Sequence, residues 1–142
     1  MKKIFIINGP NLNLLGKREE NIYGSETLED INKKISQKAE ELKLEVAFFQ
    51  SNSEGEIVSK IQELKKEGFS GLIINPGAYT HTSIAIRDAI AGVNINTIEV
   101  HISNIHSREE FRKQSFIAPV CIGQISGLSY FGYIYALEYF AN

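Results

Sequence analysis

GLIINPGAYTHTSIAIRDAI, residues 71–90, contains a strand, a turn and the start of a helix in one stretch. Its first four residues form a short apolar run, which is typical of a buried parallel strand. The apolar positions 85, 86, 89 and 90 then repeat at helical spacing. A strand that opens directly into a helix is therefore predicted. In an open α/β sheet such a junction lies at the carboxyl edge of the strands, where crevices for ligands form.

Polar and titratable side chains follow the predicted strand. Asn75, His81 and Asp88 place hydrogen-bonding groups near the expected sheet edge. A purely structural interpretation is that Asn75 begins a turn and that Thr80 or Thr82 caps the helix. Capping explains the threonines but leaves His81 and Asp88 without a role.

The composition indicates a single domain over residues 1–142. A chain of this length with 43% hydrophobic residues can bury one sizeable core. The 15 basic and 17 acidic residues give a net charge of -2, so no general field attracts nucleic acid or anionic lipid. The single cysteine, Cys121, excludes an internal disulfide and fits a reducing compartment. We expect it to act as a small buried hydrophobe rather than as a nucleophile.

Neither end of the chain predicts a membrane segment. The start MKKIFIINGPN resembles a signal peptide only briefly, because Asn8, Gly9 and Pro10 interrupt the apolar run, and a first strand is the better interpretation. Residues 114–137 carry no charge and are long enough to raise the question of a membrane span. Pro119 and several glycines favour a buried strand, turn and helix instead. We expect a cytoplasmic protein with no membrane partner.

Strands and helices alternate along the chain. Strands are expected at residues 3–7, 44–49, 71–74, 95–102 and 120–125. Helices are expected at residues 27–42, 56–67, within 75–90 and at 128–140, with a short helical turn at 107–111. This pattern predicts an α/β fold: a flavodoxin-like, doubly wound parallel five-stranded sheet with helices on both faces and the strand order 2-1-3-4-5.

A long polar loop, residues 8–24, follows the first strand and is called the lid loop below. Loops of this length inside a compact domain are usually functional and are often lids. The loop contains Asn11, Arg18 and Tyr23. A tyrosine is a poor base at neutral pH unless a nearby cation stabilises its phenolate, and arginine remains charged throughout. One arginine and one tyrosine in a loop are a weak signal by themselves.

A polar ladder ends the fourth predicted strand. Glu99, His101 and Ser103 occur at every second position, so in an extended chain they project from one face while Val100 and Ile102 project from the other. A carboxylate close to His101 would orient its ring and favour the protonated form that a general acid needs. The alternative is a histidine whose neighbours satisfy it for structural reasons only.

Other chemistries find little support in the sequence. Arg108, Arg112 and His106 follow the fourth strand and are candidates for contact with a carboxylate or hydroxyl. There is no GxGxxG after the first strand, no Walker loop, no CxxC pair and no HExxH metal motif. The acidic pair of a phosphoacceptor module is also missing, since the third strand ends at Asn75.

Five motifs taken together resemble the type II 3-dehydroquinate dehydratases. They are NGPNLNLLGKR at 8–18, IYG at 22–24, FFQSNSEG at 48–55, NPGAYTHTSIAIRDA at 75–89 and EVHISNIHSREEFR at 99–112. The resemblance implies a flavodoxin-like domain assembled as a dodecamer of trimers. It also implies that the substrate 3-dehydroquinate loses water to give 3-dehydroshikimate through an enolate, without metal or cofactor. This step serves both aromatic biosynthesis in the shikimate pathway and quinate breakdown.

The resemblance also implies roles for the catalytic residues. Tyr23 would be the base that takes the proton beside the ketone, and Arg18 would keep it as phenolate. Asn11 would help to hold the water that stabilises the enolate. His101, supported by Glu99, would donate a proton to the departing hydroxyl.

The remaining implied residues bind substrate. Three side chains would hold substrate hydroxyls: Asn75, His81 and Arg112. The substrate carboxylate would be held by the backbone of Ile102 and by Ser103. Asp88 would reach the site of a neighbouring subunit.

Two departures and two alternatives accompany the resemblance. The lid loop reads KREENIYG, without the proline that often follows the first glutamate, and Ser129 stands where glycine is common. One alternative function is a non-catalytic flavodoxin-like module that binds small anions. Another is a lyase or hydrolase that acts on a different hydroxy acid.

Overall fold

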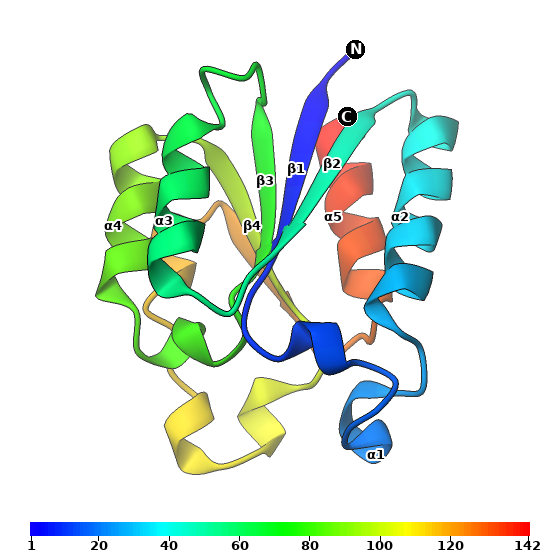
Figure 1. Ribbon diagram of the computed structural model, residues 1–142, viewed down its shortest axis with the longest axis vertical. Coiled ribbons are helices and arrows are strands. Elements are labelled where there is room, and N and C mark those ends of the chain that lie inside the picture. Colours follow the sequence, from blue (N-terminus) through cyan, green and yellow to red (C-terminus); the bar gives the residue numbers. More distant parts are fainter.

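The computed structural model describes all 142 residues and contains one five-stranded parallel sheet. The strands are β1 (Lys3–Asn8), β2 (Glu45–Gln50), β3 (Gly71–Asn75), β4 (Asn96–His101) and β5 (Gly123–Ser126). Their order across the sheet is β2-β1-β3-β4-β5, and every neighbouring pair is parallel. The predicted fold class and strand order are confirmed (Figure 1).

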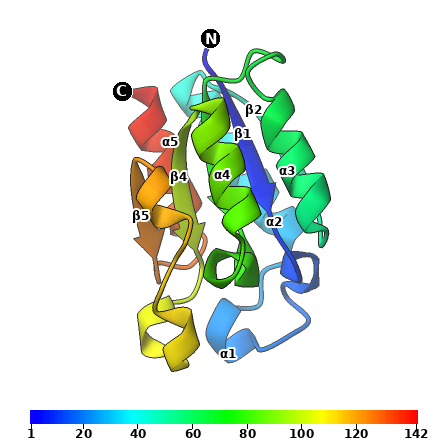
Figure 2. The ribbon, with the colours of Figure 1, turned by 90° about the vertical axis from the view of Figure 1, so that its left-hand side faces the viewer.

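Two pairs of helices cover the two faces of the sheet. In Figure 1, α2 (Leu28–Leu42) and α5 (Phe131–Ala141) lie on one side, and α3 (Glu54–Glu63) and α4 (Ile84–Val93) lie on the other. The short helix α1 (Glu20–Tyr23) and the loop after β4 lie at the end of the sheet opposite the two termini. Figure 2 shows β5 at the edge of the sheet, beside β4.

Alternation along each strand divides the core between the two faces. In β1, Ile4 and Ile6 belong to the core under α2 and α5, whereas Phe5 and Ile7 belong to the core under α3 and α4. In β4, Val100 packs in the first of these cores. Successive side chains of a strand point to opposite faces, so Glu99 and His101 face away from that core, as predicted.

The register of the central strands brings polar residues to one edge. Asn8 at the end of β1 pairs with Asn75 at the end of β3, and Ile74 pairs with Glu99 of β4. Because the strands are parallel, their carboxyl ends meet at the same edge of the sheet. The lid loop, the segment after β3 and the loop after β4 all start there.

The junction after β3 differs from the prediction. A 3₁₀ helix, η2 (Gly77–His81), separates β3 from α4, so the strand does not open directly into the helix. Ser83 caps α4, because its hydroxyl accepts the Ile86 N–H at 2.9 Å. The purely structural alternative, in which Thr80 or Thr82 caps the helix, is wrong: Ser83 is the cap, and the Thr80 hydroxyl donates to Glu99 at 2.6 Å.

Several boundaries also shift. Strand β5 begins three residues later than predicted. The reason is that Pro119 lies within a 3₁₀ turn, η5 (Ala118–Val120), where the chain is not extended. The helical turn expected at 107–111 is replaced by two 3₁₀ turns, η3 (Ile105–Ser107) and η4 (Glu110–Arg112). The lid loop contains η1 (Leu12–Leu14) and α1, neither of which the hydrophobic pattern indicates. No helix has the length and apolar character needed to span a membrane.

Ser129 adopts a conformation that favours glycine. Its φ of 57° lies in the left-handed region, which costs a residue with a Cβ atom about 1–2 kcal/mol. Replacing Ser129 with glycine removes this cost. Glycine loses more conformational freedom on folding, however, and this loss offsets part of the stabilisation. We predict that Ser129→Gly raises the free energy of unfolding by about 0.5–1 kcal/mol, measured by urea denaturation.

Ser59→Gly is the matched control, because Ser59 is an exposed serine within α3. Glycine in a helix interior should lower the free energy of unfolding by about 0.5 kcal/mol. Equal destabilisation by the two substitutions would show that Ser129 is not strained.

Candidate active site

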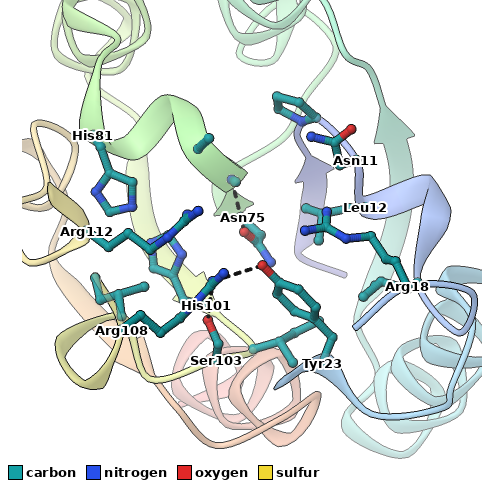
Figure 3. Close-up of a pocket in the computed structure, with 16 residues that line it drawn as sticks. Asn11, Leu12, Arg18, Tyr23, Asn75, His81, His101, Ser103, Arg108 and Arg112 are labelled. Carbon is teal, nitrogen blue, oxygen red and sulfur yellow. Dashed lines mark hydrogen bonds between the residues drawn. The ribbon is translucent and has the colours of Figure 1, made fainter. Parts of the chain in front are cut away.

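One pocket lies at the carboxyl edge of β1, β3 and β4 and has a cavity volume of about 90 Å³. Figure 3 shows its walls: residues of the lid loop on one side, and His81 and Arg112 on the other. Every residue predicted for the site lines it except Glu99 and Asp88. The predicted residues in its wall are Asn11, Arg18, Tyr23, Asn75, His81, His101, Ile102, Ser103 and Arg112.

Glu99 lies directly beneath the pocket and is fully buried. Its carboxylate accepts hydrogen bonds from His101 Nε2 at 2.5 Å, from the Thr80 hydroxyl at 2.6 Å and from the Ser115 hydroxyl at 2.9 Å. Burial alone would raise the pKa of Glu99, but the hydrogen bonds and the charge of His101 outweigh it and lower the pKa below its ordinary value. Glu99 is therefore an anion at neutral pH.

The two histidines of the pocket have defined tautomers. A carboxylate and a carbonyl can only accept, so His101 carries a proton on Nε2 toward Glu99, and His81 carries one on Nδ1 toward the Gln114 carbonyl at 2.8 Å. The other nitrogen of each ring is free to meet a ligand. Partial burial lowers the pKa of His81 from its ordinary value, although the Gln114 carbonyl opposes the shift. His81 is thus neutral at neutral pH and offers an acceptor.

Tyr23 lies on the opposite side of the pocket between two arginines. Arg108 Nη1 donates to the Tyr23 hydroxyl at 2.9 Å and to the Ser103 hydroxyl at 3.2 Å. The Arg18 guanidinium lies over the Tyr23 ring, 4.8 Å from its centroid, and also pairs with Glu19 at 2.8 Å. The contact with the phenol oxygen is therefore made by Arg108 (Figure 3).

Arg108 is a site residue that sequence reasoning did not single out from its neighbours. Its side chain is 13% exposed, against 31% for Arg18, so its charge is less screened by solvent. Arg108 is far from Tyr23 in sequence, and only its place after the fourth strand indicated that it could reach the sheet edge. Nothing in the sequence distinguishes it from a solvated arginine.

Asn75 is fixed from below by a buried tyrosine of α5. Tyr133 donates to Asn8 Oδ1 at 2.5 Å and accepts from Asn75 Nδ2 at 3.0 Å, while Asn75 Oδ1 accepts the Gly77 N–H at 3.1 Å. Burial raises the pKa of Tyr133, so it remains a neutral donor. One N–H of Asn75 is left for a ligand. Tyr133 was not predicted, because it lies in an apolar helical pattern.

Close backbone contact joins the lid loop to the segment after β3. A Cβ atom on Gly9 would lie 2.4 Å from the Pro76 carbonyl oxygen, so only glycine fits there. Two residues further on, Asn11 has a φ of 70°, and its backbone N–H donates to Asn52 at 3.1 Å. The Asn11 side chain lines the pocket without a partner in the chain.

Comparison with known proteins agrees with this geometry. The model of the family described as dehydroquinase class II matches residues 2–141. The chain belongs to this family. It is 66% identical over 137 residues to a 3-dehydroquinate dehydratase of Caldicellulosiruptor bescii, covering 96% of this chain and 94% of that protein.

Solved structures of class II dehydroquinases share the fold closely. The type II dehydroquinase of Butyrivibrio crossotus superposes with a TM-score of 0.97 at 53% identity, covering 99% of this chain and 98% of that one. The enzyme of Propionibacterium acnes gives 0.95 at 40% identity, covering 99% of this chain and 97% of that one.

Two predicted residues and one cysteine lie outside the wall of this dehydroquinase pocket. Glu99 is bonded to the pocket residue His101 but does not itself line the pocket. Asp88 is on the exposed face of α4 and does not reach the pocket of its own chain. Cys121 is partly buried against the core, as expected of a small hydrophobe, and burial raises the pKa of its thiol to about 12. No group of three or more His, Cys, Asp and Glu side chains is arranged to hold a metal ion.

The position of Tyr133 leads to a stability prediction. Tyr133→Phe leaves buried amide groups of Asn8 and Asn75 without a partner, so the free energy of unfolding should fall by about 1–3 kcal/mol. Urea denaturation measures it. Tyr139→Phe, at a 59% exposed tyrosine of the same helix, should change stability by less than about 0.5 kcal/mol. Equal effects of the two variants would contradict the proposed role of the Tyr133 hydroxyl.

Proposed function

We propose that this protein is a hydro-lyase that converts 3-dehydroquinate to 3-dehydroshikimate. One observation carries the proposal: a phenol with an arginine on its oxygen and a histidine with a carboxylate behind it line the same pocket. A base and an acid on opposite sides of one cavity are what an elimination of water requires. Membership of the class II dehydroquinases supports the choice of substrate.

Tyr23 is the base. As phenolate it removes the proton beside the ketone, and the electron pair of that C–H bond passes into an enolate. Arg108 stabilises the phenolate through a direct hydrogen bond, and Arg18 adds a second positive charge over the ring. Arg18 was predicted for this role from the resemblance, and the structure adds Arg108 as a second candidate.

His101 is the acid. Glu99 accepts a hydrogen bond from the Nε2–H group of His101. Nδ1 is therefore the nitrogen that faces the substrate and protonates the departing hydroxyl. The enolate then collapses to the conjugated enone as the C–O bond breaks and water leaves. A positioned acid contributes a factor of about 10² to 10⁴ to such a step.

The remaining polar groups bind substrate. Asn11 holds the water that stabilises the enolate oxygen. Three side chains hold substrate hydroxyls: Asn75, His81 and Arg112. Ser103 and the backbone of Ile102 hold the carboxylate. Ser103 also contacts Arg108, which is bonded to Tyr23, so the carboxylate-binding group lies next to the proposed base.

Assembly and setting extend the proposal. Asp88, on the exposed face of α4, reaches the pocket of a neighbouring subunit in a dodecamer built from trimers. The protein acts in the cytoplasm, in the shikimate pathway. Closure of the lid loop brings Arg18 and Tyr23 over the substrate and expels bulk water.

The ultraviolet band of the conjugated enone tests the activity. Wild-type protein should produce it from 3-dehydroquinate. Tyr23→Phe should lower turnover by about 10²-fold or more while the fold survives. Arg18→Ala and Arg108→Ala should each lower turnover greatly. Lys113→Ala, an exposed lysine paired with Glu110, is the control and should be unaffected.

Two outcomes of this assay refute parts of the proposal. Near-normal turnover of Tyr23→Phe removes it as the base. If wild-type protein binds small anions but forms no enone, it is a non-catalytic binding module instead.

Asp88→Ala tests the assembly. The variant loses the contact of Asp88 with the pocket of the neighbouring subunit. It should therefore raise the Michaelis constant, measured by steady-state kinetics, or reduce the oligomer size, measured by analytical ultracentrifugation. Glu41→Ala, an exposed carboxylate on α2, should change neither. If Asp88→Ala also changes neither, Asp88 does not belong to the site.

A further inference from the structure

A short segment after η4, residues 114–116, contacts three parts of the active site in succession. The Gln114 carbonyl accepts from His81 Nδ1 at 2.8 Å. The Ser115 hydroxyl donates to Glu99 at 2.9 Å. The Phe116 N–H donates to the Thr80 carbonyl at 2.8 Å. We call these residues the bracket.

The Ser115 hydroxyl has one orientation. It accepts the N–H groups of Ile117 at 3.1 Å and Ala118 at 2.9 Å, which begin η5. A hydroxyl has two lone pairs and one proton, so both lone pairs are occupied and the proton is directed to Glu99. The sequence offers no sign of this contact, because serine in a loop is common.

We propose that Ser115 is a positioning residue for the dehydration step: it holds the Glu99 carboxylate, which orients the His101 imidazole toward the leaving hydroxyl. Thr80 holds the same carboxylate from η2. A fully buried carboxylate without donors would rotate or take up a proton, and either change would release His101. The proposal rests on the proposed dehydratase function and adds a residue that does not touch the substrate.

Several charged and titratable groups surround His101, but apart from His101 only neutral donors contact the Glu99 carboxylate. Glu99 faces it from its own strand, His81 from η2, and Arg112 from η4. Arg108 faces the pocket from the segment between η3 and η4. Cys121, close to Glu99 after η5, remains a neutral thiol, since burial raises its pKa to about 12. No lysine or arginine is bonded to the Glu99 carboxylate, so its side-chain donors besides His101 are the hydroxyls of Thr80 and Ser115.

The test compares two rates in wild-type protein and in Ser115→Ala. One is formation of the enone, and the other is exchange in D₂O of the proton beside the ketone, followed by NMR. Since a hydrogen bond to a charged group changes an equilibrium by about 10-fold or more, dehydration should fall by about that factor. Proton exchange and the Michaelis constant should be nearly unchanged, because Ser115 does not line the pocket.

The pH profile supplies a second readout. Three donors hold the pKa of Glu99 below its ordinary value, so loss of one donor raises it. Activity requires the ionised carboxylate. The acidic limb of the turnover profile should therefore move to higher pH in Ser115→Ala, a change that mere loosening of the loop would not produce.

Matched variants separate positioning from folding. Ser115→Thr keeps the hydroxyl and should restore most of the dehydration rate. Ser51→Ala removes a buried hydroxyl that donates to Glu56 and accepts the Ser53 N–H. Ser51 neither lines the pocket nor contacts Glu99, so this variant should leave both rates intact. Should Ser115→Ala fail to fold, Thr80→Val decides, because it removes the other hydroxyl donor from Glu99.

The outcomes are distinct. Selective loss of dehydration with a shifted acidic limb supports the proposal. Equal loss of exchange and dehydration, or an unchanged pH profile, overturns it. Wild-type protein that forms no enone refutes the proposed function itself, whereas active wild-type protein with an unaffected Ser115→Ala refutes only the role of Ser115.

Discussion

The buried carboxylate of Glu99 constrains most of the active site. A charge removed from water is costly unless hydrogen bonds and an opposite charge compensate for it, and breaking such a buried pair typically costs about 3–5 kcal/mol. Its partners come from three separate segments: His101 from β4, Thr80 from η2 and Ser115 from the bracket. The same contacts that satisfy the anion therefore fix the imidazole and the loops on either side of it. Stability and chemistry depend here on the same hydrogen bonds.

The base side of the pocket is built differently. Tyr23 and Arg18 belong to the lid loop and are only half-buried, and of the two only the Tyr23 side chain packs against the hydrophobic core. Within this loop, Gly16 and Gly24 lie on either side of these two residues, with φ of 84° and 86°, conformations that glycine tolerates without strain. Segments with few buried contacts open at low free-energy cost. The proposed acid, His101, is thus held by buried hydrogen bonds, whereas the proposed base, Tyr23, lies on a half-buried loop.

The sequence predicted the parts of this arrangement that depend on local pattern. Alternating strands and helices gave the sheet order, and the ladder from Glu99 to His101 showed which side chains share a face. The missed features depend on contacts between distant residues. Arg108 in place of Arg18 at the phenol oxygen, Tyr133 beneath Asn75, and Ser115 behind Glu99 all result from tertiary packing. The 3₁₀ helix after β3 was missed because Thr80 satisfies a buried carboxylate rather than a helix end.

We infer that Tyr23 and His101 act on opposite ends of one substrate molecule. A crystal structure of Tyr23→Phe with bound 3-dehydroquinate tests it most directly, because that variant should bind substrate without turning it over. We expect the ring of residue 23 to lie beside the carbon next to the ketone, and His101 Nδ1 to lie within hydrogen-bond distance of the hydroxyl that leaves. Substrate bound with His101 directed at any other group, or in a pocket that excludes residue 23, would contradict it.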